Sequence, residues 1–155
     1  MEIATTLVLH LAKLGIAYDV VKHAYSNSSL HSAHAANIPA SNVVKSVVLE
    51  DAQGYVMALV PADRHVKINE VNMVYNRRMG LATEPELEQI FTDCDRGAIP
   101  PVGNAYGMST IVDKNLDECN DVYIEAGTHT DLLHISGGAF RKLMEHSQHA
   151  SICVH

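Results

Sequence analysis

The chain has 155 residues, of which 47% are hydrophobic and 19% charged, and this is typical of one globular domain. Asp and Glu outnumber Lys and Arg by 18 to 11, so the net charge of −7 excludes the broad basic surface of a duplex-binding protein. Three widely spaced cysteines without a Cys-x-x-Cys motif favour a reducing cytoplasm and predict neither a disulfide framework nor a zinc knuckle. The N-terminus lacks a signal-peptide pattern, and no apolar stretch reaches the roughly 20 residues of a membrane span.

The first half of the chain predicts two helices, a strand and a β-hairpin. Apolar residues at helical spacing predict a helix over 3–14, ended by the glycine that follows. A strand over 16–21 and a short helix over 30–36 come next. Two apolar runs, over 43–49 and 55–60, flank a polar turn that ends in glycine, which is a hairpin pattern.

The second half mixes helices and strands without strict alternation. A helix is expected over 67–77, and a capping box at Thr83 and Glu86 opens another that runs through Phe91. Three strands and a last helix follow, at 109–112, 121–125, 132–135 and from Ser136. The whole chain, residues 1–155, is therefore predicted to be a single α+β domain.

Lys45 is the first candidate site residue. It lies in a strand among four valines, where a buried ammonium is costly unless it has a partner. If Lys45 lines a pocket, it can polarise a carbonyl or hold an anionic oxygen. An edge-strand lysine that prevents aggregation remains the alternative.

The segment 97–101 is the second candidate. Gly97 allows a positive φ and the close approach of a ligand, and two prolines stiffen the loop. The N–H groups of Ala98 and Ile99 are then expected to be free to point into a site. Such a loop can hold an ester carbonyl or a ribose, although an ordinary structural loop is the alternative.

Other chemistry is poorly supported by the sequence. Ten histidines include two pairs at i,i+3 spacing, but no third ligand and no His-Glu-x-x-His accompany them, so no metal site is predicted. No nucleophile elbow, Walker motif or dinucleotide fingerprint is present. His129 follows a predicted strand end, where sites often lie, while Asp93 and Asp95 are expected to be solvated turn residues.

Taken together, these segments resemble the YbaK family of aminoacyl-tRNA deacylases, which are related to the editing insertion of bacterial prolyl-tRNA synthetase. The resemblance is carried, in order, by four segments and by Val112-Asp113 after them: 43–49 with Lys45, 58–63, 81–87, and 97–103 with its Gly-x-x-x-Pro pattern. It extends from about His23 to Leu143, which is most of the chain.

The resemblance implies a mixed, strongly curved sheet approaching a barrel, flanked by helices. It implies hydrolysis of the ester that joins a wrong amino acid to the terminal ribose of a tRNA, with no metal, no other cofactor and no enzyme nucleophile. Lys45 would be the catalytic residue and would hold a phosphate or carbonyl oxygen. Gly97 and Pro101 would shape the aminoacyl pocket with Ala98 and Ile99, and a weaker carry-over adds His129 to the substrate-binding residues.

We therefore expect a cytoplasmic trans-editing enzyme that acts on aminoacyl-tRNA, with Lys45 and the 97–101 loop facing one cleft. The acidic charge suggests that tRNA binding needs a local basic edge, from Arg64, Arg77 or Arg78, or a synthetase partner. Pro100 departs from the small residue of many relatives and removes a donor. It leaves open a second function, a module that binds a nucleotide or small acyl ligand without turnover. A histidine-based metal protein is a third.

Overall fold

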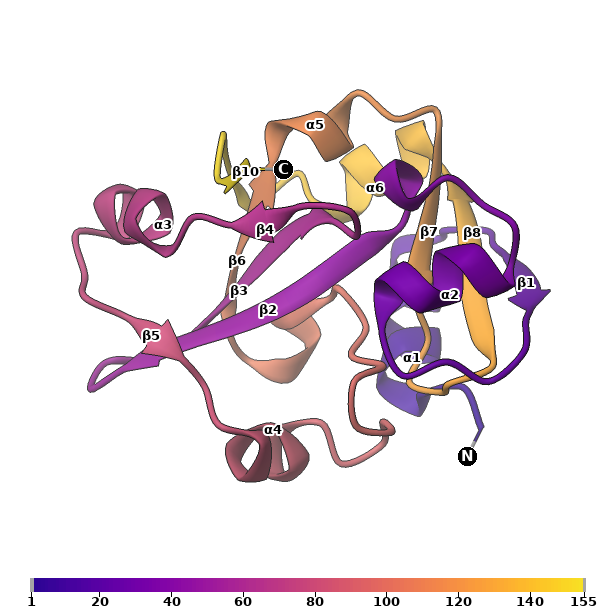
Figure 1. Ribbon diagram of the computed structural model, residues 1–155, viewed down its shortest axis with the longest axis horizontal. Helices are drawn as coiled ribbons and strands as arrows, with labels where there is room; N and C mark the ends of the chain where they lie inside the picture. The colour runs from indigo at the N-terminus through magenta and orange to yellow at the C-terminus, as the bar shows by residue number, and fades with distance from the viewer. Residues whose placement is uncertain (1, 155) are drawn as a thin grey trace.

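The strands pair into three sheets in the computed structural model, which describes residues 2–154 (Figure 1). The strands are β1 (Asp19–Lys22), β2 (Val44–Asp51), β3 (Gly54–Pro61), β4 (His65–Val66), β5 (Gly80–Leu81), β6 (Ser109–Asp113), β7 (Asp121–Glu125), β8 (Asp131–Ser136), β9 (Gln148–Ala150) and β10 (Cys153–Val154). The helices are α1 (Thr5–Leu14), α2 (Ser29–Ala35), α3 (Ile68–Tyr75), α4 (Glu84–Ile90), α5 (Lys114–Asp117) and α6 (Gly137–Leu143), with 3-10 turns η1 (Ala40–Asn42) and η2 (Gly103–Tyr106).

The largest sheet is mixed, in the order β5-β2-β3-β6-β9. β2 and β3 form the predicted antiparallel hairpin, while β6 runs parallel to β3 and β9 parallel to β6. The second edge of β2 is paired only at Leu49 and Glu50, with β5. Within residues 2–154 no strand therefore pairs with this edge at 45–47.

Successive side chains of β2 enter different cores, because a strand points alternate residues to opposite faces. Val44 and Val48 pack in the main core with α1 and the end of α4. Val47 and Leu49 pack in a second core, which α3 covers with Val71. β2 therefore separates two environments within one sheet.

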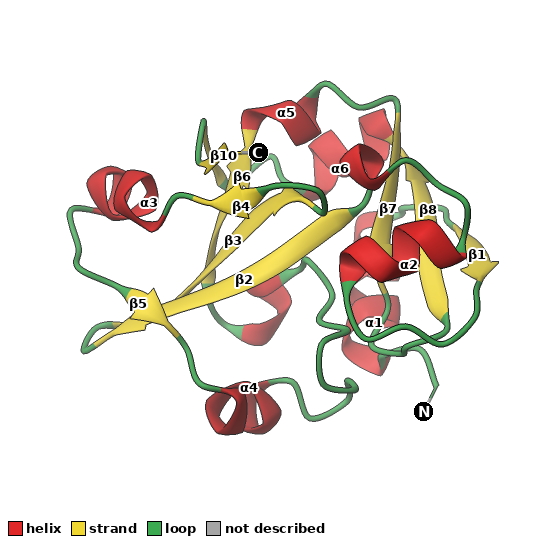
Figure 2. Cartoon of the chain, viewed as in Figure 1, coloured by secondary structure: helices red, strands yellow, loops and turns green. Residues whose placement is uncertain are grey.

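The three-stranded sheet β1-β8-β7 lies between two helices. Val122 and Ile124 of β7 face the main core that contains α1. Tyr123 faces the opposite side, where α2 packs through Ala33. Figures 1 and 2 show α2 in front of β7 and β8 in this view.

The α+β class is confirmed, but the expected barrel-like sheet is wrong. None of the three sheets is closed within the described residues, and one isolated parallel bridge, between Val43 and Tyr123, joins the strand region before β2 to β7. This single bridge, rather than a continuous ladder of hydrogen bonds, connects the two regions. The structure therefore has separate sheets in place of the single curved sheet that the resemblance implies.

Local patterns placed the long elements correctly and missed the short ones. The first strand begins at Asp19 rather than Ile16, because Ile16 is buried in the main core directly after α1 ends. α3 stops at Tyr75, because Asn76 adopts the left-handed conformation. The two-residue strands β4, β5 and β10, together with β9, form only through distant partners and have no periodicity of their own.

Two leucines of α1 provide a matched test of the main core. Leu11 is fully buried, whereas Leu9 is 64% exposed on the same helix. We expect Leu11→Ala to lower the free energy of unfolding by about 2–5 kcal/mol, because it leaves a cavity. Leu9→Ala should change it by less than about 0.5 kcal/mol, as measured by urea denaturation. Equal losses in the two variants would contradict this packing.

Candidate functional site

The 97–101 loop is held in place by segments far away in the sequence. Gly97 has a φ of 83°, and a Cβ at this position would lie 2.9 Å from the carbonyl oxygen of Asn27. The carbonyl of Ala98 accepts a hydrogen bond from the N–H of Gly127 at 2.9 Å. Only glycine allows this close approach, so the loop is seated against the end of β7 and the residues before α2.

One expected donor of this loop is already used. The N–H of Ala98 donates to the carbonyl of Asp95 at 3.1 Å, and Ala98 is fully buried. The expectation that it points freely into a site is therefore wrong. The N–H of Ile99 has no acceptor among residues 2–154.

Asp93 anchors the same region, so its expected role as a solvated turn residue is also wrong. Its carboxylate accepts the N–H of Thr6 in the first turn of α1 at 2.9 Å and the hydroxyl of Tyr106 at 2.8 Å. The N–H groups in the first turn of a helix lack partners within the helix, so an acidic acceptor stabilises this end of α1.

A cleft of about 120 Å³ lies beside Gly97 and Ile99, and we call it the loop cleft. The residues that line it are Ser29, Ser46, Glu84, Leu87, Gly97 and Ile99. The hydroxyl of Ser46 donates to the carbonyl of Ile99 at 3.2 Å, which joins β2 to the loop. An engineered apolar cavity of roughly 150 Å³ is large enough to bind benzene, so the loop cleft has room for a small organic group.

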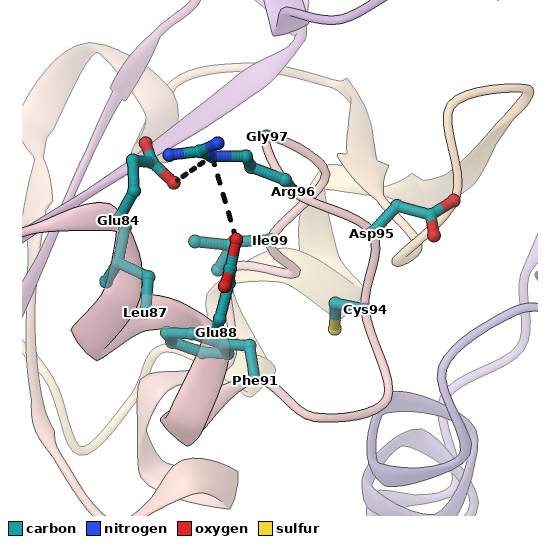
Figure 3. Close-up of a pocket in the computed structure, with 9 residues that line it drawn as sticks. All are labelled: Glu84, Leu87, Glu88, Phe91, Cys94, Asp95, Arg96, Gly97 and Ile99. Atoms are coloured by element: carbon teal, nitrogen blue, oxygen red, sulfur yellow. Dashed lines mark hydrogen bonds and ion pairs between the residues drawn. The ribbon is translucent and has the colours of Figure 1, made fainter.

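A smaller hollow is also lined by Gly97 and Ile99 and shares the wall formed by α4 (Figure 3). At its rim the guanidinium of Arg96 lies 3.1 Å from the carboxylate of Glu84 and 3.9 Å from that of Glu88. These side chains are largely exposed, so the pairs contribute little to stability. They do compensate the charge of Glu84 at the edge of the loop cleft.

Lys45 lies on the opposite face of β2 from the loop cleft. Its half-buried ammonium donates a hydrogen bond to the carbonyl of Arg64, and burial lowers the pKa of Lys45, an effect partly offset by Asp63. Because adjacent side chains of a strand point apart, Ser46 faces the loop and Lys45 does not. The expectation that Lys45 and the 97–101 loop face a single cleft is therefore wrong.

The other expected site residues are divided between two places. His129 lies beside Gly97, since a Cβ on Gly97 would be 3.9 Å from its Cε1, and its ring lies 4.9 Å from that of Tyr25. Pro101 instead lines a separate hollow with His10. The structure thus brings together Gly97, Ile99 and His129, and it adds Ser29, Ser46, Glu84 and Leu87, which no sequence motif identified.

Glu125, at the end of β7, is a buried acid that belongs to none of the sequence motifs described above. It is 2% exposed, and its Oε1 has no hydrogen-bond partner among residues 2–154. Burial raises its pKa from 4.5 to about 7, while hydrogen bonding from Ser32 and Ser29 acts in the opposite direction. A carboxyl at the end of the apolar run 122–124 was the available sequence clue, because an acid is rarely buried without a function or a partner.

The structure contains neither a cluster of metal-ligand side chains nor a membrane-spanning helix within residues 2–154. In the described part of the chain, no three His, Cys, Asp or Glu side chains are grouped closely enough to hold a metal ion. His149 is instead bonded to Asp117 at 2.6 Å and to the carbonyl of Met144 at 2.8 Å. No helix within 2–154 has both the length and the apolar character needed to cross a bilayer.

The raised pKa of Glu125 predicts a pH-dependent loss of stability. The folded state holds this proton up to about pH 7, whereas the unfolded state releases it near pH 4.5, so folding is progressively disfavoured as the pH rises through this window. Relative to Glu125→Gln, the wild type should lose up to about 3 kcal/mol of unfolding free energy between pH 4.5 and 8. Urea titrations of both proteins would measure the difference, and a difference that is constant with pH would contradict the burial.

Comparison with known proteins identifies the family to which this chain belongs. Residues 26–143, well over half of the chain, match the model of the aminoacyl-tRNA editing domain. None of the curated protein sequences matches the chain. Among solved structures, the hypothetical protein APE2540 is 19% identical with a TM-score of 0.84, and the match covers 96% of this chain and 99% of that one.

Two further structures share the fold. A candidate trans-editing enzyme for prolyl-tRNA synthetase is 20% identical with a TM-score of 0.83, covering 97% of this chain and 96% of that one. A candidate signal transduction protein from Marinobacter aquaeolei is 17% identical with a TM-score of 0.81, covering 99% of this chain but 31% of that longer one. These likenesses establish the fold, and the match over residues 26–143 shows that the chain belongs to the aminoacyl-tRNA editing domain family.

Proposed function

We propose that this protein is a trans-acting deacylase that hydrolyses the ester of a mischarged aminoacyl-tRNA, with the aminoacyl group bound in the loop cleft. The family supports tRNA editing as the process. The observation that carries the placement is the loop cleft itself, whose lining combines the hydroxyl residues Ser29 and Ser46 with the apolar residues Leu87 and Ile99. Its volume favours a small aminoacyl group such as alanyl, seryl or cysteinyl.

In this proposal the protein positions the ester and a water molecule performs the attack. The water adds to the acyl carbon, the bond to the ribose oxygen breaks, and the ribose leaves as a hydroxyl that has taken up a proton. The hydroxyl of Ser46 is placed to donate to the developing oxyanion if it exchanges its bond with the Ile99 carbonyl for one with the substrate. An ester is already activated, so positioning and carbonyl polarisation are sufficient.

Lys45 enters this proposal as a phosphate ligand rather than as a group inside the loop cleft. The edge of β2 at 45–47 has no strand partner in the described chain, so a single-stranded 3′ end can cross it with its ester on the Ser46 face and a phosphate on the Lys45 face. The ammonium has three donors, and Arg64 occupies one of them. Arg77, expected as part of a basic edge, instead pairs with Asp51 in the β2–β3 turn at 2.9 Å.

The three cysteines are all free thiols. A reducing compartment suits them, and we propose that the protein acts in the cytoplasm, alone or beside a synthetase.

Deacylation of alanyl-, seryl- and cysteinyl-tRNA by the purified protein tests the function. Turnover of at least one is expected, and Lys45→Met should raise its KM by about 10- to 100-fold with a smaller change in kcat, because a charged contact is lost in binding. It should also reduce the slope of log affinity against log salt by about 0.7, the value for one phosphate on a single strand.

Lys13→Met, which removes an exposed lysine of α1, is the matched control and should change neither quantity. Absence of turnover with every aminoacyl-tRNA would contradict the deacylase. Binding of an aminoacyl-adenosine analogue without hydrolysis would then identify a ligand-binding module. An unchanged KM in Lys45→Met would contradict the phosphate contact alone.

A further inference from the structure

Glu125 is a buried acid that the proposed hydrolysis does not use. It projects from β7 to the side on which α2 packs, where the hydroxyls of Ser29 and Ser32 lie beside its carboxyl. Ser32 is also bonded to Ser26, with 2.6 Å between the two hydroxyl oxygens. Oε1 of this carboxyl has no hydrogen-bond partner among residues 2–154, and the residue is 2% exposed. A buried carboxylate without compensation is costly, so a cation brought to the wall in front of it would gain affinity.

Ser29 connects this carboxyl to the loop cleft. Ser29 is one of the residues that line the cleft, and its hydroxyl lies beside Glu125. Two residues after Glu125, Gly127 donates its N–H to Ala98, so the end of β7 is fixed against the same loop that forms the other wall. The carboxyl therefore lies directly behind one wall of the cleft.

The charges around the loop cleft favour a cationic ligand group at this wall. Glu84 is the other acid that lines the cleft, and Arg96 already compensates it at 3.1 Å. His129 lies at Gly97, across the loop, and the exposed His31 of α2 contacts Asn27 at 3.4 Å. None of these contacts supplies a cation to Glu125.

We propose that the hydroxyl of Ser29 binds the α-ammonium group of the aminoacyl ester and that the carboxyl of Glu125, directly behind it, supplies the attracting negative charge. This inference rests on the proposed function and names the part of the substrate that is recognised. The Ser29 oxygen can accept one of the three ammonium donors, and the carboxyl behind it attracts the positive charge across a short distance of low-dielectric protein. The α-amine is attached to the carbon next to the ester carbonyl, so anchoring it also fixes the carbonyl within the cleft. The raised pKa of Glu125 is consistent with this role, since a bound ammonium would favour ionisation of the carboxyl.

The test uses two analogues that cannot be hydrolysed, 3′-alanylamino-3′-deoxyadenosine and its N-acetyl derivative, with binding to the full chain measured by calorimetry at pH 7. The wild type should bind the free amine about 10- to 100-fold more tightly, the effect of a hydrogen bond to a charged group. Glu125→Gln keeps the shape of the side chain but removes the charge, and it should reduce this preference to about twofold or less.

Asp113→Asn is the matched control, because Asp113 is also a buried acid but lies in β6, on a different sheet from Glu125. Its carboxylate accepts a hydrogen bond from the N–H of Ile152. It should keep the full preference for the free amine. Equal binding of the two analogues by the wild type, a preference retained in Glu125→Gln, or failure of both analogues to bind at millimolar concentration would overturn the inference. Selective binding without turnover of any aminoacyl-tRNA would contradict the deacylase and leave the amine site standing.

Discussion

The alternation of side chains along β2 is the constraint on which the rest of the site depends. β2 lies between two cores, so each residue from Val44 to Leu49 is assigned to one face or the other. This alternation directs Ser46 to the loop cleft and Lys45 to the face of the second core, where it bonds the carbonyl of Arg64. A substrate that contacts both must cross the strand edge, and within residues 2–154 that edge has no strand partner where these two residues lie.

The loop cleft is assembled by long-range contacts rather than by a local motif. Asp93 holds the loop region to the start of α1, Ala98 holds it to Gly127, and Gly97 lies against Asn27. These contacts join residues at least 29 positions apart in the chain, as the Ala98–Gly127 pair illustrates. A wall fixed in this way is organised before the ligand arrives, which lowers the entropic cost of binding.

The proposed action on tRNA requires an acidic protein to rely on a few well-placed cations. The net charge is −7, and two of the arginines are already engaged, Arg77 by Asp51 and Arg96 by Glu84. Specificity for the end of the substrate would then come from the polar groups of the cleft rather than from general electrostatic attraction. Glu125 fits this arrangement, because a buried acid attracts the cationic amine of an aminoacyl group and not the polyanionic chain that carries it.

The sequence by itself determined the α+β class, the β2–β3 hairpin and the capping-box helix α4. Each of these depends on neighbouring residues, whose spacing and turn chemistry are visible in one window. The tertiary structure alone decided that the sheet is not a barrel, that Asp93 caps α1, that Lys45 and Ser46 serve opposite faces, and that Glu125 lies behind the cleft. These outcomes depend on which distant segments pack together, and burial between such segments sets both the direction of a side chain and the cost of its charge.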